Sequence, residues 1–439
     1  MSQATIPQDD KCNGWYQLLD EPAPARRLNA QKDVDWLVIG AGFTGLAAAR
    51  RIAELRPNER VVLLDALRVG QGASGRNTGF VIDLPHKRDL EGGDIARKQK
   101  LLTLNQAAVS DLSELVARQG IECGWSLAGK YQGAVGERGL AYLDHFETLL
   151  KNFDYPYRRL ERDALEPILG TRHYAAAIFT DNTALMQPAA LVRGLAKTLP
   201  ANVELYEHSP VVDLKRLGGQ WRARTPEGEV RAANLLLGSN IYSQEFGFLK
   251  HRMLPVMTFA SMTRELTDDE MRLFSTAPHH FGLTPADHAG TTVRLTPDRR
   301  LIVRNQYQFV PRYHDDLAER MRIREGHRQS FLVRYPSLGH VPFAATWGGA
   351  CGLSRNYTAF FGKVGDHAWM SGVHQSVGAA RGTISGKLLA ELATGQDSSQ
   401  LSDMLMVSGK PALNPPEPFL SLGVKTRMKQ AAWASRSEL

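Results

Sequence analysis

The chain has 439 residues, of which 43% are hydrophobic, and its formal net charge is +7 at pH 7. A chain of this size and composition can bury a large core and should form two or three domains, which excludes an intrinsically disordered protein. Its basic residues are spread out with acidic residues between them, and no recognition module stands out, so no nucleic acid is expected as a partner.

Neither a membrane span nor an export signal is expected. The longest apolar stretches are interrupted by glycines, whereas a transmembrane helix needs about 20 apolar residues in a row, and the polar N-terminus lacks a charged start followed by an apolar segment. Cys12, Cys123 and Cys351 are far apart and form no metal-binding or disulfide pattern. We therefore expect a cytoplasmic protein without a bound metal.

The first expected elements after an irregular arm are a strand, a turn and a helix. Residues 34–39 (VDWLVI) predict a buried strand, and 46–55 (LAAARRIAEL) predict a helix that Pro57 ends. Residues 61–66 (VVLLDA) predict a second buried strand. Together these elements form one βαβ unit.

Further along the chain, helices are expected over 94–121, 139–153 and 187–200, the last with Pro188 near its start. From about residue 203, short strands separated by glycine-containing turns predict a meander that ends in NLLLGS (234–239). The following stretch to residue 345 mixes strands with a charged helix. The chain then returns through a strand at HAWMSGV (367–373) and a helix over 378–395 to the first domain.

Gly40, Gly42 and Gly45 form a GxGxxG pattern between the first strand and its helix, and Asp65 closes the next strand, 65 − 45 = 20 residues after the last glycine. Such glycines allow a tight turn and a close approach of the backbone to a pyrophosphate, which the helix N-terminus then binds. Asp65 would accept hydrogen bonds from ribose hydroxyls and would repel a 2′-phosphate, which disfavours NADP. We also predict contacts with the cofactor for the neighbouring residues Phe43, Thr44 and Ala66.

A second glycine-rich segment, 70–79 (GQGASGRNTG), begins five residues after the acid. Ser74, Arg76, Asn77 and Thr78 offer donors at close range, as a pyrophosphate or an isoalloxazine edge requires. The fingerprint alone does not distinguish FAD from NAD. Its place near the start of the chain and this second segment favour FAD.

The predicted C-terminal helix carries glycines every four residues, at Gly378, Gly382 and Gly386. This small-residue stripe allows close packing on a neighbouring helix. Its N-terminus at Ser376, Val377 and Gly378 can direct amides and a helix dipole at the flavin carbonyl that becomes negative on reduction.

These segments resemble the FAD-dependent D-amino-acid-oxidase family, which includes glycine, sarcosine, γ-glutamylputrescine and L-pipecolate oxidases. The resembling pieces cover nearly the whole chain: VIGAGFTGLAAA, GASGRNTGF, QPAALVRGLA, VVDL, NLLLGSN, TWGG and GVHQSVGAARGTISGKLLAEL. The resemblance places Val212, Gly238 and Ser239 near the cofactor. The likeness is greatest to the bacterial branch that holds the γ-glutamylputrescine and L-pipecolate oxidases.

The expected fold class is α/β (α+β overall), with a Rossmann-like FAD-binding domain made of discontinuous segments and a substrate domain with a mainly antiparallel sheet. The expected divisions are an arm (1–33), the FAD-binding domain (34–90, 187–245 and 346–407), the substrate domain (91–186 and 246–345) and a basic tail (408–439).

The substrate site needs a group that binds a carboxylate, because an isolated carboxylate is expensive to desolvate and arginine offers a bidentate partner. The catalytic candidates are Arg355, His374 and Tyr307, while Arg294, Arg304 and Lys363 are left unranked. No protein base is required, since the flavin supplies the redox chemistry.

Two departures from the family's pattern limit the transfer of roles. Residues 356–359 (NYTA) stand where many relatives have an acid followed by proline, so the role of that acid cannot be transferred. Cys351 lies near the site of covalent flavin attachment in sarcosine-oxidising members but is displaced from it. We therefore expect a buried thiol and non-covalently bound FAD.

The leading functional hypothesis is oxidation of a small amino or imino acid to the imine, with L-pipecolate and hence lysine catabolism favoured by the resemblance. The alternatives are γ-glutamylputrescine or another amine as substrate, an NAD-dependent dehydrogenase, and a non-catalytic flavin-binding redox sensor. Electrons would pass to oxygen or to a respiratory-chain acceptor. The tail from Pro415 is basic and amphipathic, which fits either peripheral contact with the inner face of the membrane or a docked surface helix.

Overall fold

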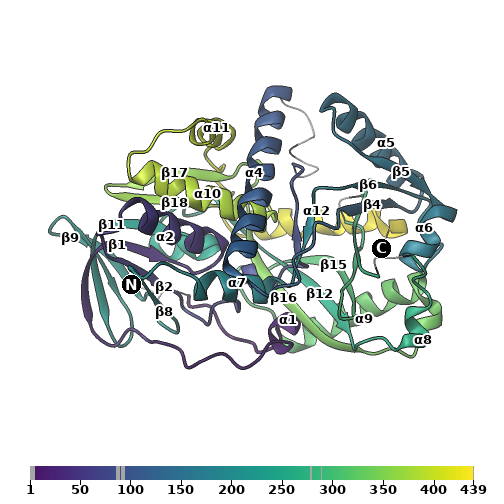
Figure 1. Cartoon of the computed structure of the whole chain (residues 1–439), viewed down its shortest axis with the longest axis horizontal. Helices are drawn as coiled ribbons and strands as arrows, with labels where there is room; N and C mark the ends of the chain where they lie inside the picture. The colour runs from purple at the N-terminus through teal and green to yellow at the C-terminus, as the bar shows by residue number, and fades with distance from the viewer. Residues whose placement is uncertain (1–4, 86–88, 90–93, 277–278, 288, 439) are drawn as a thin grey trace.

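Two large β-sheets organise the protein (Figure 1). The structure is a computed structural model, and it describes residues 5–85, 89, 94–276, 279–287 and 289–438. Each sheet has eight strands. The α/β class with a mainly antiparallel second sheet is confirmed.

The first sheet gathers strands from distant parts of the chain in the order β17-β18-β11-β1-β2-β8, and the hairpin β9–β10 extends from β11. β1 pairs in parallel with β2 and β11, and β2 pairs in parallel with β8. The strands are β1 Gln31–Ile39, β2 Val61–Leu64, β8 Val203–Tyr206, β9 Asp213–Leu217, β10 Gln220–Arg224, β11 Glu229–Leu237, β17 Phe360–Gly365 and β18 Ala368–Gly372.

Both faces of the first sheet are covered, which explains why β1 and β2 are almost continuously apolar. Helices α2 and α10 pack against each other on one face, and α4, α7 and α11 join the same core. The hairpin and the segment after β11 cover the other face. The elements are α2 Phe43–Leu55, α4 Ile95–Gln119, α7 Pro188–Lys197, α10 Gly378–Ala393, α11 Ser399–Val407 and the 3-10 helix η2 Asn240–Phe246.

The second sheet has the order β16-β12-β15-β14-β13-β4-β6-β5. β13 and β4 pair in parallel, and the other described pairs are antiparallel. The strands are β4 Lys130–Ala134, β5 Arg158–Glu161, β6 Ala176–Thr180, β12 Leu254–Thr263, β13 Phe281–Pro285, β14 Thr292–Leu295, β15 Leu301–Phe309 and β16 Phe343–Leu353.

Helix α9 covers one face of the second sheet, where Phe331 and Tyr335 pack on Leu283, Val293 and Val303. The opposite face contacts the first part of the chain, since Arg294 Nη1 donates to Gly79 O at 3.0 Å. The remaining elements are α1 Gly14–Gln17, α5 Glu137–Asn152, α6 Arg162–Leu169, α8 Asp268–Met271, α9 Leu317–Arg334, α12 Phe419–Ala434, the strands β3 Phe80–Val81 and β7 Ala184–Leu185, and the 3-10 helices η1 Ala73–Gly75, η3 Pro336–Leu338 and η4 Arg436–Glu438.

The sequence predicted helices α2, α4, α5, α7 and α10 to within a few residues, whereas it predicted no element between residues 154 and 186 and no helix at α11. Two of the predicted domain boundaries can be compared with the sheets. The proposed return to the first domain at residue 346 falls within β16, which pairs with β12 along its length. Helix α4, proposed for the substrate domain, packs on α10 and α11. The boundary between 90 and 91 lies outside the described residues, and the domain division stays a proposal.

The C-terminal tail is docked on the second sheet. Helix α12 packs against β15, and the Glu438 carboxylate accepts hydrogen bonds from Val135 N at 3.0 Å and Gly136 N at 2.8 Å, just before α5. Ser435 Oγ donates to Asp287 at 2.6 Å. None of the helices in the described part of the chain is long and apolar enough to span a membrane.

Replacing Glu438 by Ala should destabilise the fold. The two partly buried backbone N–H groups of Val135 and Gly136 would lose their acceptor, at a cost of about 1–3 kcal/mol. Thermal unfolding should show a midpoint several degrees below the wild-type value, whereas Glu438→Gln, which keeps one acceptor oxygen, should lose less. An E438A protein that unfolds at the wild-type temperature would contradict the assigned anchoring of the tail.

Candidate active site

The turn between β1 and α2 depends on glycines. Gly40 has a φ of +99°, which glycine adopts at no steric cost. A Cβ on Gly45 would lie 1.7 Å from Gly40 O, and one on Gly42 would lie 2.6 Å from Ser74 Oγ. Helix α2 begins at Phe43, and its N-cap Gly42 has no side chain to cap it. Phe43 N donates to Ser74 Oγ at 3.1 Å, and Gly42, Phe43 and Thr44 line a cavity, so the start of the helix faces a space where a phosphate could bind.

Asp65 lies directly after β2, beside this turn. Its carboxylate accepts hydrogen bonds from Ala41 N at 2.7 Å and Leu67 N at 2.9 Å. Burial raises the pKa of Asp65 to about 6, although the backbone donors favour the ionised form. At neutral pH the group is thus mainly a carboxylate, which can accept hydrogen bonds from ribose hydroxyls.

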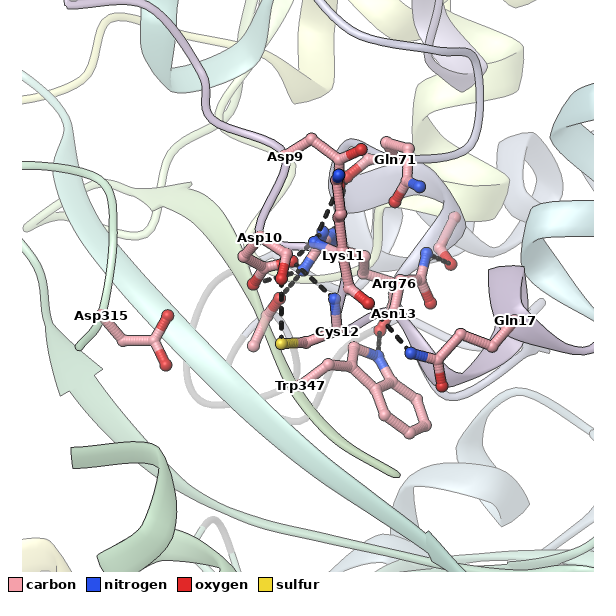
Figure 2. A network of polar contacts seen from close by, with 12 residues as sticks. Asp9, Asp10, Lys11, Cys12, Asn13, Gln17, Gln71, Arg76, Asp315 and Trp347 are labelled. Atoms are coloured by element: carbon pink, nitrogen blue, oxygen red, sulfur yellow. Dashed lines mark hydrogen bonds and ion pairs between the residues drawn. The ribbon is translucent and has the colours of Figure 1, made fainter. Parts of the chain in front are cut away.

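The N-terminal arm holds the loop 70–79 in place (Figure 2). Arg76 Nε donates to Gln71 O at 2.6 Å, and Nη1 donates to Gly348 O at 3.0 Å. Both Nη atoms donate to the carboxylate of Asp10, at 3.1 and 2.6 Å. Asn13 Nδ2 donates to the carbonyls of the loop at Gly70 and Gly75. The Arg76 guanidinium therefore fixes the shape of the loop.

Asp10 also connects the arm to helix α9. Its Oδ2 accepts a hydrogen bond from Arg320 Nη2 at 3.1 Å, while Arg320 Nε donates to Asp315 at 2.8 Å and Nη1 to Cys12 Sγ. Burial alone would raise the pKa of Asp10, but Arg76 and Arg320 lower it below its ordinary value. One carboxylate thus joins the arm, the loop and the second sheet's covering helix.

The segment before α10 is conformationally unusual. Val373, Gln375 and Ser376 have φ angles of 60°, 53° and 66°, in the left-handed region that non-glycine residues rarely adopt. His374 Nε2 lies 3.1 Å from Thr44 Oγ1 and so joins this segment to the first turn of α2. Burial lowers the pKa of His374 to about 4, so the ring is neutral at pH 7.

A cavity of about 1300 Å³ is lined by residues of both sheets. Pockets for a single small molecule are commonly about 300–1,000 Å³, so this one has room for a dinucleotide together with a substrate. The lining includes Gly40, Gly42, Phe43, Thr44, Asp65, Ala66, Ser74, Arg76, Asn77, Thr78, Gly238, Ser239, Ser376, Val377 and Gly378. His374 and Tyr307, two of the catalytic candidates, also line it.

Three predicted site residues lie outside this lining. Gly45 stands behind Gly40 and acts through packing. Val212 precedes β9 and donates its N–H to Arg224 O at 2.8 Å, and its neighbour Val211 lines the cavity instead. Arg355 is exposed in the turn after β16, a position that does not support its proposed role in carboxylate binding.

The substrate side of the cavity has a different cation, Arg304 on β15. Its Nη1 donates to Tyr307 Oη at 2.9 Å, and its guanidinium carbon lies 4.8 Å from the Tyr307 ring centroid. Cys351 Sγ lies 3.4 Å from Ser376 Oγ. Burial raises the pKa of the Cys351 thiol, and the charge of Arg304 opposes that shift. Arg304 therefore faces the region where the segment before α10 meets β16.

The other unranked candidates do not reach the cavity. Arg294 is buried and donates to Met186 O and two carbonyls of the loop, and Lys363 is exposed. The sequence did not predict that residues 5–10 of the arm line the cavity, or that the C-terminal tail contributes Arg427 of α12 and Arg436 of η4. The Asp and Trp residues of the arm were visible in the sequence, but nothing there showed that the arm folds back onto the loop.

The residues present fit FAD. Among the described residues that line the cavity, Gln71 Oε1 is buried without a hydrogen-bond partner, and a Cβ would fill the space at Gly40 and Gly42. The turn after β1 and Asp65 would hold the adenosine diphosphate half, and residues 74–78 and 376–378 the flavin half. FAD, when bound, supplies the redox chemistry.

A dinucleotide turn on one sheet, facing a mainly antiparallel sheet across a shared cavity, defines an FAD-dependent oxidoreductase. The chain belongs to the FAD dependent oxidoreductase (DAO) family, whose model matches residues 35–392. It is therefore an FAD-dependent amine or amino-acid oxidoreductase, which confirms the family, the enzyme class and the cofactor expected from the sequence.

Relatives of known name cover most of the chain. It is 28% identical over 381 residues to the probable oxidoreductase OrdL of Haemophilus influenzae, covering 83% of each protein. It is 26% identical over 383 residues to the gamma-glutamylputrescine oxidoreductase of Escherichia coli, covering 85% of this chain and 86% of that protein. Glycine oxidase from Geobacillus kaustophilus shares the fold, with a TM-score of 0.71 at 17% identity over 84% of this chain and 96% of its own.

Replacing Gly45 by Ala should abolish FAD binding. The new Cβ would lie 1.7 Å from Gly40 O, so the turn and the start of α2 must move apart. The ratio of absorbance at 450 and 280 nm of the purified protein (about 450 nm being the visible band of oxidised flavin) should fall at least tenfold. Gly423→Ala is the matched control, since a Cβ there meets nothing within 4 Å. Full flavin content in G45A would contradict the proposed role of the turn.

Replacing His374 by Asn should make the protein less sensitive to acid. The pKa of His374 is about 4 in the fold against an ordinary value of 6.5. The unfolded chain therefore binds a proton at this site below about pH 6.5, whereas the folded chain does so only near pH 4. Stability from this group is present above pH 6.5 and is lost as the pH falls toward 4. Urea unfolding at pH 7 and at pH 4.5 gives the free energy of unfolding that each protein loses between these two pH values. This loss should be about 1–3 kcal/mol smaller in H374N than in the wild type. Equal losses in the two proteins would refute the prediction.

Proposed function

We propose that the enzyme oxidises the C–N bond of a small amino or imino acid to the imine, with L-pipecolate, a compound of lysine catabolism, as its first candidate substrate. The observation that carries this proposal is Arg304, a guanidinium that lines the cavity and forms no ion pair within the described ranges. A carboxylate in this cavity needs such a partner, because desolvating it alone is expensive.

Arg304 and Tyr307 would act together on the carboxylate of the substrate. Arginine binds a carboxylate through two parallel N–H groups, and the Tyr307 ring and hydroxyl hold the guanidinium in one orientation. We propose that His374 acts on the cofactor side, where it positions the start of α2 through Thr44. Arg304 thus takes the carboxylate-binding role first suggested for Arg355.

The charge of this wall would also keep the amine neutral, as C–N oxidation requires. A nearby cation disfavours the protonated form of an amine. The described carboxylates that line the cavity are Asp9, Asp10, Asp65, Glu245 and Asp315. Asp10 and Asp315 are paired with arginines, and Asp65 lies at the dinucleotide turn, on the other sheet from Arg304. None of the five forms an ion pair with Arg304 within the described residues.

The second candidate substrate is γ-glutamylputrescine or another amine. The relative from Escherichia coli bears the name of that substrate, and the cavity extends along the second sheet well beyond Arg304. Electrons from either substrate would pass to oxygen or a respiratory-chain acceptor. We also propose that FAD is bound non-covalently, since burial keeps the Cys351 thiol protonated by raising its pKa.

We propose a cytoplasmic location with peripheral contact at the inner face of the membrane through α12. Phe419, Leu422 and Trp433 are 67%, 68% and 69% exposed, and their spacing puts them on one side of the helix. Residues on other sides of α12 line the cavity. An apolar stripe beside basic residues is typical of helices that lie on anionic lipid.

L-Pipecolate should bleach the visible flavin band of the purified enzyme when oxygen is excluded. The assay compares L-pipecolate with D-pipecolate, proline, sarcosine and γ-glutamylputrescine, each added alone. Bleaching by one compound identifies the substrate. A yellow protein that none of the five reduces would leave the FAD assignment intact and remove the substrate proposal.

Replacing Arg304 by Met should lower kcat/KM for an α-amino or α-imino acid by about 30- to 1,000-fold, because a charge-assisted bidentate partner contributes about 2–4 kcal/mol. Arg304→Lys should recover part of the loss. The same change at exposed Arg355 should leave kcat/KM within about twofold. Equal losses in R304M and R355M would contradict the assignment.

A further inference from the structure

A row of polar side chains crosses the cavity face of the second sheet and starts at Arg304. Thr292 on β14 lies opposite Arg304 on β15, and Thr284 on β13 lies beside Gln132 on β4. The register of β13 with β14 brings Thr284 next to Thr292. All four line the cavity. Neighbouring strands lie about 4.8 Å apart, so this polar row spans about 14 Å.

Lys130 stands at the far end of the polar row. It precedes Gln132 by two residues on β4, so both side chains lie on the same face of the sheet. Its exposed fraction is 3%, and Nζ lies 3.4 Å from Gln132 Oε1 and 5.4 Å from the Phe146 ring centroid. Lysine is almost never fully buried unless it is paired, yet Lys130 makes no ion pair with any residue that the structure describes.

If no ligand binds here, the simplest explanation for the buried Lys130 ammonium is that it neutralises Asp83. Asp83 is fully buried, but its oxygens already accept hydrogen bonds from Tyr155 Oη at 2.5 Å and Thr183 Oγ1 at 3.5 Å. Asp83 forms no ion pair with Lys130. Burial has the larger effect and lowers the pKa of Lys130 to about 8, although the charge of Asp83 acts to raise that pKa. The ammonium is thus mainly charged at pH 7 and lines the cavity without a contacting counterion.

We infer that Lys130 and Gln132 form a distal subsite for an anionic group of the substrate. The ammonium supplies the charge and the Gln132 amide supplies a further donor, while Thr284 and Thr292 can bind polar groups along the chain between. Such a substrate carries an anionic group at the far end of an extended polar chain from the oxidised C–N bond. This fits an amino acid with a second carboxylate or an amine conjugate, the second candidate class, and not L-pipecolate, which has no second anionic group. This inference rests on the proposed function and names the substrate class of the same site.

The test measures binding of linear dicarboxylates, from glutarate to sebacate, to the FAD-loaded enzyme through changes in its visible flavin spectrum. Monocarboxylates of equal chain length are the matched probes. One of the longer dicarboxylates should bind at least tenfold more tightly than its monocarboxylate, because it reaches both Arg304 and Lys130. In Lys130→Met this ratio should fall below threefold.

A second pair of variants separates binding from folding. K130M leaves the Asp83 carboxylate buried beside a neutral side chain, so the double variant D83N/K130M is compared with D83N alone. The dicarboxylate preference should be present in D83N and lost in the double variant. Flavin content and thermal unfolding show that each variant is folded.

The outcomes decide between the two explanations of Lys130. If Lys130 only neutralises Asp83, K130M lowers the unfolding temperature and leaves the dicarboxylate-to-monocarboxylate ratio unchanged, which overturns the inference. A wild-type enzyme without a preference for longer dicarboxylates overturns it as well. A preference that depends on Lys130, in an enzyme whose flavin none of the tested amines bleaches, supports the subsite and refutes the proposed function.

Discussion

Three segments of the chain approach one another at the start of α2 so closely that no Cβ fits between them. A Cβ on Gly45 would lie 1.7 Å from Gly40 O, one on Gly386 would lie 2.1 Å from Thr44 O, and one on Gly238 would lie 2.8 Å from Gly45 N. Because only glycine allows these approaches, β1, β11 and α10 can converge on one point of the first sheet. The N-cap residue of α2, Gly42, has no side chain, and the first N–H of the helix donates to Ser74 Oγ of the loop 70–79 instead. The shape of the cofactor end of the cavity and the position of α10 both depend on this packing.

The N-terminal arm connects the first sheet to the second through the ion pairs of Asp10. Arg76 and Arg320 both approach Asp10, and without its carboxylate two guanidinium groups would face each other with like charge. Trp15 supports the same connection, since its Nε1 donates to Asn77 O at 2.8 Å and its ring packs edge-on against Trp347 of β16. The loop 70–79 is therefore held from the arm and from the second sheet at once. The hydrogen bonds of Arg76 to other parts of the protein thus fix the position of the donors that this loop would offer to a cofactor.

The features that the sequence predicted correctly are those encoded by local pattern. The glycine turn, the acid 20 residues after Gly45 and the helix over 378–395 depend on neighbours in the chain, and the structure contains each of them. Arg355 lies near the TWGG segment in the sequence, but β16 ends before it and its side chain is exposed in the following turn. Arg304 could not be ranked, because its place opposite Thr292 depends on strand register, which no local pattern specifies. The docking of the arm and of Glu438 likewise depends on contacts between residues about 66 to 303 positions apart.

Both walls of the cavity contribute positive potential, beside the carboxylates that also line it. The sources of that potential differ between the walls, and this difference fits the proposed chemistry. On the first sheet the potential comes from backbone N–H groups and helix N-termini, which cannot lose a proton and suit a permanently anionic pyrophosphate. On the second sheet it comes from Arg304 and Lys130, whose side chains can pair with a carboxylate. His374, between the walls, adds no charge at pH 7 because burial lowers its pKa to about 4. A substrate amine that enters this field loses stability in its protonated form. Under the proposed function, the enzyme would need no carboxylate or imidazole base beside the reacting carbon, since the charge of the wall that would bind the acid also favours the neutral amine.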